Sequence, residues 1–260
     1  MSDADAPQAD SVEVEVFPHS PVSEAILGIE LPQLDDLTGY ADTFHAALRD
    51  RFPIREPIET PGPDDFAWPA AKPRAPHGAR RVGPLGFRLF SEDRLEVAQV
   101  TRRSLSYHRL SPYVNWDHFM SGAVPAWRAF ARAFSPEFVA SLRLRYLNRI
   151  EIPERDKDLS EYLRMLLTIP KPVDTGFSGY LMRVTLHEPH SGAEAHVTQL
   201  SELGGSVEAP LTVIFDIDVR LQGEIAAHED ALWPAVQHLR NYKNLIFFSS
   251  LTDKARRLFR

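Results

Sequence analysis

The feature that most constrains the fold is a strand-like alternation near the end of the chain. From Pro210 to Gln222, most odd-numbered positions are apolar and most even-numbered positions are polar or charged. The apolar set is Leu211, Val213, Phe215, Ile217 and Val219, and the opposite set contains Thr212, Asp216, Asp218 and Arg220. Successive side chains of a strand point to opposite faces of a sheet. The segment therefore predicts a strand with one face against a core and the other toward polar surroundings.

Other periodic segments place this strand in a mixed fold. Strand patterns occur at 21–31, 86–90, 94–108, 140–153, 177–187 and 194–201, with a short edge strand at 12–16. Helical stripes predict helices at 35–50, 115–134, 159–169 and 227–249. Hairpins dominate and repeated strand–helix–strand crossovers are missing, so we predict an α+β fold.

The element order predicts one domain over 18–260 built from two loosely similar halves, about 18–138 and 139–260. Each half reads strand, helix, strands, helix. We expect a curved antiparallel sheet with the long C-terminal helix packed on its concave face. The acidic residues 1–17 are expected to form a disordered tail. Segment 53–84 holds eight of the 21 prolines and is predicted to be a loop. The segment is either disordered or wrapped loosely over the surface, or it forms a lid over a ligand site that Trp68 closes with its apolar side chain.

Composition excludes several classes of protein. The chain has 260 residues, of which 43% are hydrophobic and 25% charged, as in ordinary globular domains. It has no Cys, which excludes disulfides, thiolate metal sites and cysteine nucleophiles. No apolar run approaches the roughly 18–20 residues of a membrane span, and the N-terminus lacks the apolar core of a signal peptide. We therefore expect a cytoplasmic protein without membrane contact. The standard nucleotide-binding, zinc-protease and serine-hydrolase motifs are missing, so we predict no cofactor and no metal.

Charge is unevenly distributed along the chain. The net charge is -7, but residues 1–65 carry 15 acids and three bases, whereas residues 94–149 carry nine arginines and three acids. A whole-chain charge therefore does not exclude a local surface that binds anions.

The arginine-rich strand around residue 145 is the main candidate for such a surface. Arg143, Arg145 and Arg149 share one face of it, about 7–14 Å apart, while Asn148 belongs to the opposite, mainly apolar face. Arg102 and Arg103 are expected on another strand of the same half. Guanidinium groups bind phosphate or carboxylate with two parallel hydrogen bonds, so the group could hold a small anion. The alternative is cross-strand ion pairing with nearby carboxylates.

Asp216 and Asp218 are the other paired candidates. Their Cα atoms are expected about 6.5–7 Å apart on one strand face. Such a pair can divide acid and base roles or bind a divalent metal. No third oxygen ligand is evident, and salt bridges to arginines of a neighbouring strand are the alternative.

Four short motifs resemble those of a sporadically distributed, uncharacterised bacterial family of about 250 residues. Ser20-Pro-Val-Ser-Glu-Ala-Ile26 is similar to its P-P-V-x-E-A-I motif, with Ser20 in place of the first proline. Arg88-Leu-Phe-Ser91 resembles R-F-x-S, Leu144-Arg-Tyr-Leu-Asn148 resembles L-R-Y-x-N, and Asp216-Ile-Asp218 resembles D-x-D. The resemblance runs from about residue 18 to about 250. It directs attention to Glu24, Arg145, Asn148 and Asp216. Patchy distribution implies accessory genes, such as phage-defence or toxin–antitoxin loci.

Together these patterns favour a non-catalytic module that binds a partner protein or a small anionic ligand. The alternative is an enzyme of unrecognised class that uses Glu24, Asp216, Asp218 and arginines in a concave pocket. Nucleic-acid binding through the arginine-rich face is the third hypothesis. The oligomeric state has no signature in the sequence.

Overall fold

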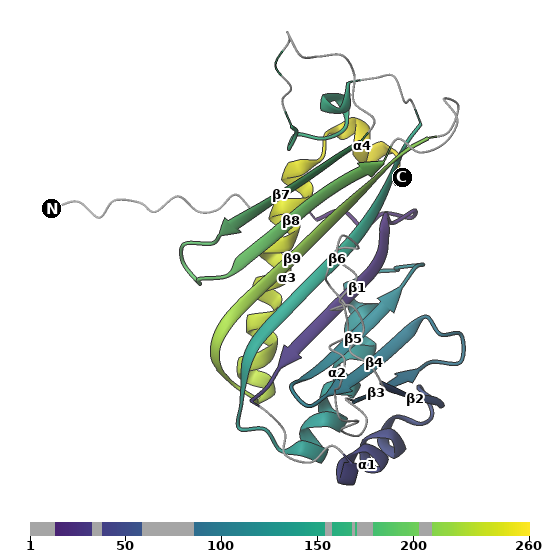
Figure 1. Cartoon of the computed structure of the whole chain (residues 1–260), viewed down its shortest axis with the longest axis vertical. Coiled ribbons are helices and arrows are strands. Elements are labelled where there is room, and N and C mark those ends of the chain that lie inside the picture. Colours follow the sequence, from purple (N-terminus) through teal and green to yellow (C-terminus); the bar gives the residue numbers. More distant parts are fainter. Residues whose placement is uncertain are drawn as a thin grey trace, which may run out of the picture.

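A computed structural model of the chain describes residues 14–32, 38–58, 86–153, 158–167, 170, 179–202 and 210–260. Within them, nine strands form one antiparallel sheet (Figure 1). The strands are β1 Val22–Glu30, β2 Ile54–Ile58, β3 Gly86–Phe90, β4 Glu96–Thr101, β5 Ser104–Leu110, β6 Phe138–Ile152, β7 Gly179–His187, β8 Glu194–Glu202 and β9 Leu211–Ala226. The helices are α1 Thr38–Leu48, α2 Trp116–Phe134, α3 Glu229–Ser250 and α4 Asp253–Arg257, with a 3-10 turn, η1, at Leu159–Glu161. The α+β class and the C-terminal helix on the sheet are confirmed.

The strand order is β2-β3-β4-β5-β1-β6-β9-β8-β7. In the first half the chain starts at the centre with β1, moves to the edge at β2, and returns inward through β3, β4 and β5. In the second half it starts at the centre with β6, moves to the edge at β7, and returns through β8 and β9. Both halves thus follow one connection pattern, and a long helix, α2 or α3, follows the last strand of each half.

Helices α2 and α3 cover the same face of the sheet (Figure 1). Phe247 of α3 stacks on Phe215 of β9, with ring centroids 6.2 Å apart. A buried row crosses six strands beneath the helices, each residue at most 2% exposed: Ala98, Tyr107, Leu27, Leu144, Val219 and Ala195. Burial of this apolar row is what the period-two alternation predicts.

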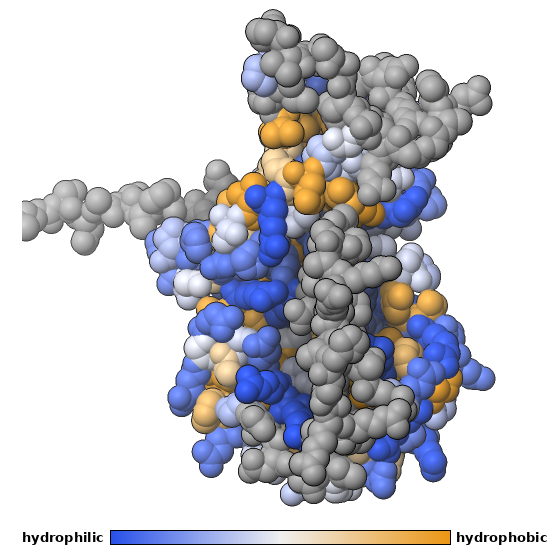
Figure 2. Space-filling model, viewed as in Figure 1, coloured by the Kyte–Doolittle hydropathy of each residue, from blue (hydrophilic) through white to orange (hydrophobic). Residues whose placement is uncertain are grey.

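The opposite side of the sheet is here called the polar face. Along its central strands it carries Ser106 and His108 of β5, Glu24 of β1, Arg143 and Arg145 of β6, and Asp216, Asp218 and Arg220 of β9. Figure 2 shows hydrophilic residues over much of the face formed by β7, β8 and β9.

One expected strand is in fact two. The segment predicted as a single strand, 94–108, folds back at Arg102 and Arg103 to form the β4–β5 hairpin. The hydroxyl of Thr101 accepts a hydrogen bond from the Arg103 amide at 3.2 Å and lies 2.8 Å from the hydroxyl of Ser104. Hydroxyl groups can stabilise turns in this way without glycine or proline. Because segment 94–108 lacks both residues, its pattern predicted one continuous strand and gave no sign of the turn.

Four other expectations need correction. Part of the proline-rich segment, Ile54–Ile58, forms edge strand β2, where Pro57 is tolerated because sheet edges leave amides unpaired. Phe17 is 7% exposed and contacts Phe248 and Phe259, so the folded chain begins before residue 18. In the described part of the helix expected at 159–169, residues 159–167, only the turn η1 is helical. The edge strand expected at 12–16 is absent from its described part, 14–16. Residues 1–13 and 59–85, with Trp68, lie outside the described residues.

Candidate functional site

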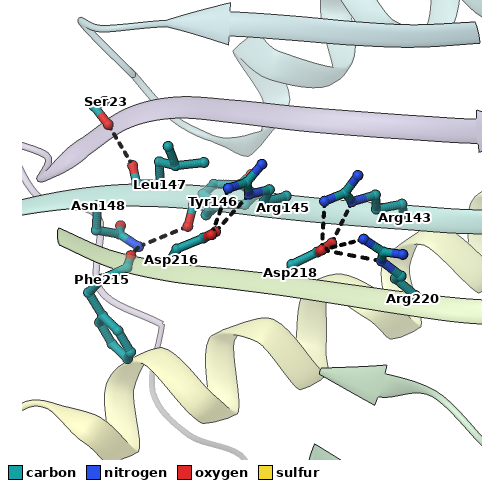
Figure 3. A network of polar contacts seen from close by, with 10 residues as sticks. All are labelled: Ser23, Arg143, Arg145, Tyr146, Leu147, Asn148, Phe215, Asp216, Asp218 and Arg220. Carbon is teal, nitrogen blue, oxygen red and sulfur yellow. Dashed lines mark hydrogen bonds and ion pairs between the residues drawn. The ribbon is translucent and has the colours of Figure 1, made fainter. Parts of the chain in front are cut away.

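Arginines and aspartates of β6 and β9 form an ion-pair network on the polar face (Figure 3). Arg143 donates from Nε and Nη2 to Asp218 at 2.5 and 2.6 Å. Arg145 donates from the same two atoms to Asp216 at 2.8 and 2.7 Å. Arg220 donates to Asp218 at 3.2 and 2.9 Å. The register places Arg145 directly opposite Asp218, so both cross-strand pairs are diagonal.

The two aspartates differ in the number of arginines that bind them. Burial raises the pKa of Asp218, but hydrogen bonds and charge from Arg143 and Arg220 outweigh it, and the pKa lies below the ordinary value. Burial also raises the pKa of Asp216, and its one bound arginine, Arg145, does not offset it. Asp218 is therefore the strongly ionised member of the network.

Cross-strand ion pairing is thus the arrangement that the structure shows for Arg143, Arg145, Asp216 and Asp218. The side-on donors that could hold an anion are bound to protein carboxylates. This network lies on a sheet face, away from the pocket described below.

The remaining arginines of the expected cluster lie elsewhere. Arg102 and Arg103 are exposed at the β4–β5 turn, where the Arg103 carbonyl accepts from Leu31 at the end of β1. The Arg149 amide donates to Pro21, at the opposite end of β1. A nine-residue strand spans about 30 Å, so these arginines do not form one site.

Glu24 lies in a short polar chain on the same face. Its Oε1 is 2.8 Å from His108 Nδ1, and His108 Nε2 is 2.9 Å from Ser106 Oγ. His108 and Ser106 are each 8% exposed. The carboxylate favours the proton on Nδ1, which leaves Nε2 to accept from the serine hydroxyl.

Asn148 faces the other way, toward the helices. Its Nδ2 donates to the Phe215 carbonyl at 2.9 Å and to the Tyr146 carbonyl at 3.3 Å. Asn148 is 1% exposed and lines a pocket on that side of the sheet. It therefore belongs to a different site from Arg143 and Arg145.

This pocket lies between α3, β6, the N-terminal residues 14–22 and residues 113–116. Its volume is about 590 Å³, its open mouth included. Aromatic rings form much of its wall: Phe17, Tyr113, Trp116, Tyr146, Phe247 and Phe248. We call it the Lys243 pocket.

Lys243 is the unusual residue of this pocket. It is 9% exposed, and its Nζ lies 4.0 Å from the ring centroid of Tyr146. It forms no hydrogen bond or ion pair with any described residue. Burial, together with the positive charge of Arg240, lowers the pKa of Lys243 to about 7. A buried amine without a carboxylate partner is costly and is typical of a functional site.

Other polar groups surround this amine. Asn244 lines the pocket, is 5% exposed and forms no side-chain hydrogen bond within the described part of the chain. The guanidinium of Arg240 lies 5.0 Å from the ring centroid of Trp116. The hydroxyls of Tyr113 and Tyr146 are 2.9 Å apart. Since one hydroxyl donates to the other, one O–H of the pair remains available as a donor.

Burial keeps both phenols protonated. It raises the pKa of Tyr113 to about 12, despite the hydrogen bond to Tyr146, and places the pKa of Tyr146 well above its ordinary value. The pocket thus offers two basic side chains, the side-chain amide of Asn244 and neutral hydroxyls within aromatic walls.

Sequence reasoning missed Lys243, Arg240, Tyr113 and Tyr146. A signal was present, because position 243 lies four residues after Leu239 and seven after Val236, on the apolar stripe of the helix. A lysine on such a stripe is either buried or extends its amine along the apolar surface to solvent.

No protein-family model and no curated protein matches the sequence. Among the described helices, none has the length and apolar character needed to cross a membrane.

Proposed function

We propose that this protein is a binding module for a small anionic ligand and that the ligand lies in the Lys243 pocket. The observation that carries the proposal is a buried lysine that faces a cavity and has no counter-charge among the described residues. An anion supplies the missing charge, and Asn244, whose side chain forms no hydrogen bond with the described residues, can donate to it.

The residues that line the pocket favour one class of ligand. Glu15 is the carboxylate that lines the pocket, and it is bound by Arg260 at 2.7 and 3.1 Å. Among the described lining residues, the charge without a counter-ion is therefore positive, from Arg240 and Lys243. Aromatic walls favour an apolar body, so the ligand class is an aromatic or branched carboxylate or a monophosphate.

Calorimetric titration with phenyllactate and phenyl phosphate tests this proposal. We expect binding to the wild-type protein, no binding of the neutral phenyllactamide, and at least about 30-fold weaker binding to Lys243→Gln, because the variant removes one partner of a desolvated charge pair. An anion favours the protonated amine, so the affinity should also fall as the pH rises above about 7.

Lys254→Gln is the matched control. Lys254 is an ion-paired lysine of α4, outside the pocket lining, and its loss should leave the affinity unchanged. Failure of both anions to bind, or equal binding to the wild-type and Lys243→Gln proteins, overturns the proposal.

We also propose an accessory role, in phage defence or a toxin–antitoxin locus. Only the family resemblance supports this role. A neighbouring toxin, nuclease or regulator gene across related genomes supports it, and unrelated neighbours count against it.

Acyl transfer is a second candidate function, favoured by the Ser106–His108–Glu24 chain. The contacts match the order nucleophile, base and orienting carboxylate, with distances of 2.9 and 2.8 Å. Asp216 and Asp218 are held by arginines and are assigned no catalytic role.

Labelling with a fluorophosphonate probe tests this second function. A reactive serine displaces fluoride and forms a covalent adduct on Ser106 that Ser106→Ala lacks and that Glu24→Gln reduces. Ser104→Ala, at the end of the same strand, is the control and should label normally. An unlabelled wild-type protein excludes the function.

A further inference from the structure

We infer that Lys243 captures a 2-oxo acid reversibly by forming an imine with its carbonyl carbon. This inference rests on the proposed pocket and names the ligand class more narrowly. It assigns to the buried amine a covalent role that simple anion binding does not need.

The surroundings of Lys243 favour the nucleophilic, neutral amine. The side chain lies against the faces of Tyr146 and Phe247, at 4.0 and 5.9 Å from their ring centroids. The face of Tyr146 attracts a cation, whereas the loss of water on burial and the like charge of Arg240, one turn earlier on α3, disfavour the ammonium form. Desolvation and a neighbouring cation are the two means by which proteins prepare a lysine for imine formation.

The charged and titratable groups around the amine come from every element of the pocket. Arg240 belongs to the same helix, Tyr146 to β6 and Tyr113 to the segment before α2. Glu15 comes from the N-terminal segment and is bound to Arg260. No carboxylate of the described residues pairs with Lys243 to keep it protonated.

Arg240 supplies the recognition that a 2-oxo acid needs. Lys243 is three residues after Arg240 on α3, and side chains at this spacing are neighbours on one helix face. A guanidinium binds the carboxylate, and the adjacent carbonyl carbon then lies next to the amine. In a 2-oxo acid the carboxylate and the carbonyl carbon are directly bonded. Arg240 and Lys243, which are neighbours on the helix, can therefore contact the two groups at once.

The step balances without a further reactant. The Nζ lone pair attacks the carbonyl carbon, and the π electrons move to oxygen to give a carbinolamine. The C–O bond then breaks, and the oxygen leaves with the two amine hydrogens as water. The product is an imine, C=N. Water reverses both steps, so capture needs no oxidant and no reductant.

Reductive trapping tests the inference. The full-length protein is incubated with phenylpyruvate and sodium cyanoborohydride, and the intact mass and peptide map are recorded. We expect the mass to increase by that of phenylpyruvate less one oxygen atom, with the adduct on Lys243. Trapping should increase as the pH rises through about 7, opposite to the pH dependence of phenyllactate binding.

Two variants separate the inference from the proposed function. Lys243→Arg keeps the charge but has no imine-forming amine, so it should bind phenyllactate and form no adduct. Lys254→Gln should be trapped as the wild-type protein is. If wild-type protein binds phenyllactate but gives no adduct on Lys243, the imine is wrong and the anion site stands. If neither probe binds, the proposed function fails as well.

Discussion

Replacing Lys243 by methionine is expected to stabilise the protein. Methionine has a similar length and no charge, so it should fill the same space against Tyr146 and Phe247 without the desolvation cost. The pKa of Lys243 falls from 10.5 to about 7 on folding, which corresponds to at most about 5 kcal/mol of destabilisation when the amine is protonated. We therefore expect Lys243→Met to increase the free energy of unfolding by a few kcal/mol at pH 6.

The increase in the free energy of unfolding caused by Lys243→Met should become smaller as the pH rises. Between about pH 7 and 10.5 the unfolded chain binds more protons at this lysine than the folded protein does, so wild-type stability rises with pH across this window. The advantage of Lys243→Met should shrink to about 2 kcal/mol at pH 9. Urea denaturation at pH 6 and pH 9 measures both values.

Lys254→Met serves as the control, because Lys254 lies outside the pocket and is paired with Glu161. It should produce no gain at either pH. A Lys243→Met protein that is less stable than wild type at pH 6 would show that Lys243 is not a buried charge without a partner. A stabilised variant that no longer binds anions would show that stability is given up for function at this position.

The sheet could be predicted from the sequence because its signal is local. Alternation along β6 and β9 identified both faces, and the apolar stripe of α3 identified the helix that covers one of them. The β4–β5 turn could not be predicted, since hydroxyl groups of Thr101 and Ser104 form it without glycine or proline. The strand order is also absent from local patterns, because it depends on which strands meet at the centre.

The candidate sites were predicted less well than the sheet, because they too depend on which segments of the chain meet. The arginines were recognised by residue type, but whether they bind a ligand or a neighbouring carboxylate depends on register. The pairing of β6 with β9 joins Arg145 to Asp216 and Arg143 to Asp218. The Lys243 pocket combines four separate segments of the sequence, so its only sequence signal was the position of one lysine on an apolar helical stripe.

Asp218→Asn is expected to destabilise the protein far more than Asp216→Asn. Asp218 neutralises Arg143, which is 7% exposed, and also binds Arg220. Removing its charge takes away the carboxylate that binds a buried guanidinium, which typically costs about 3–5 kcal/mol. Asp216 binds Arg145 alone, and its raised pKa shows that burial already disfavours its charge. We expect its asparagine variant to cost about 1–2 kcal/mol.

Chemical denaturation at pH 7 and pH 3 measures this difference, with Glu151→Gln as a control. Glu151 pairs with Arg149 at a solvent-exposed position, so its loss should change stability by less than about 1 kcal/mol. The folded pKa of Asp218 lies below its unfolded value, so its contribution is present above the unfolded pKa and is lost as the pH falls through the folded pKa. The loss of unfolding free energy caused by Asp218→Asn, relative to the wild-type protein, should therefore be smaller at pH 3 than at pH 7. Equal costs for the two asparagine variants would mean that Arg220 adds nothing to the network and that the ion pairs of β6 and β9 are equivalent.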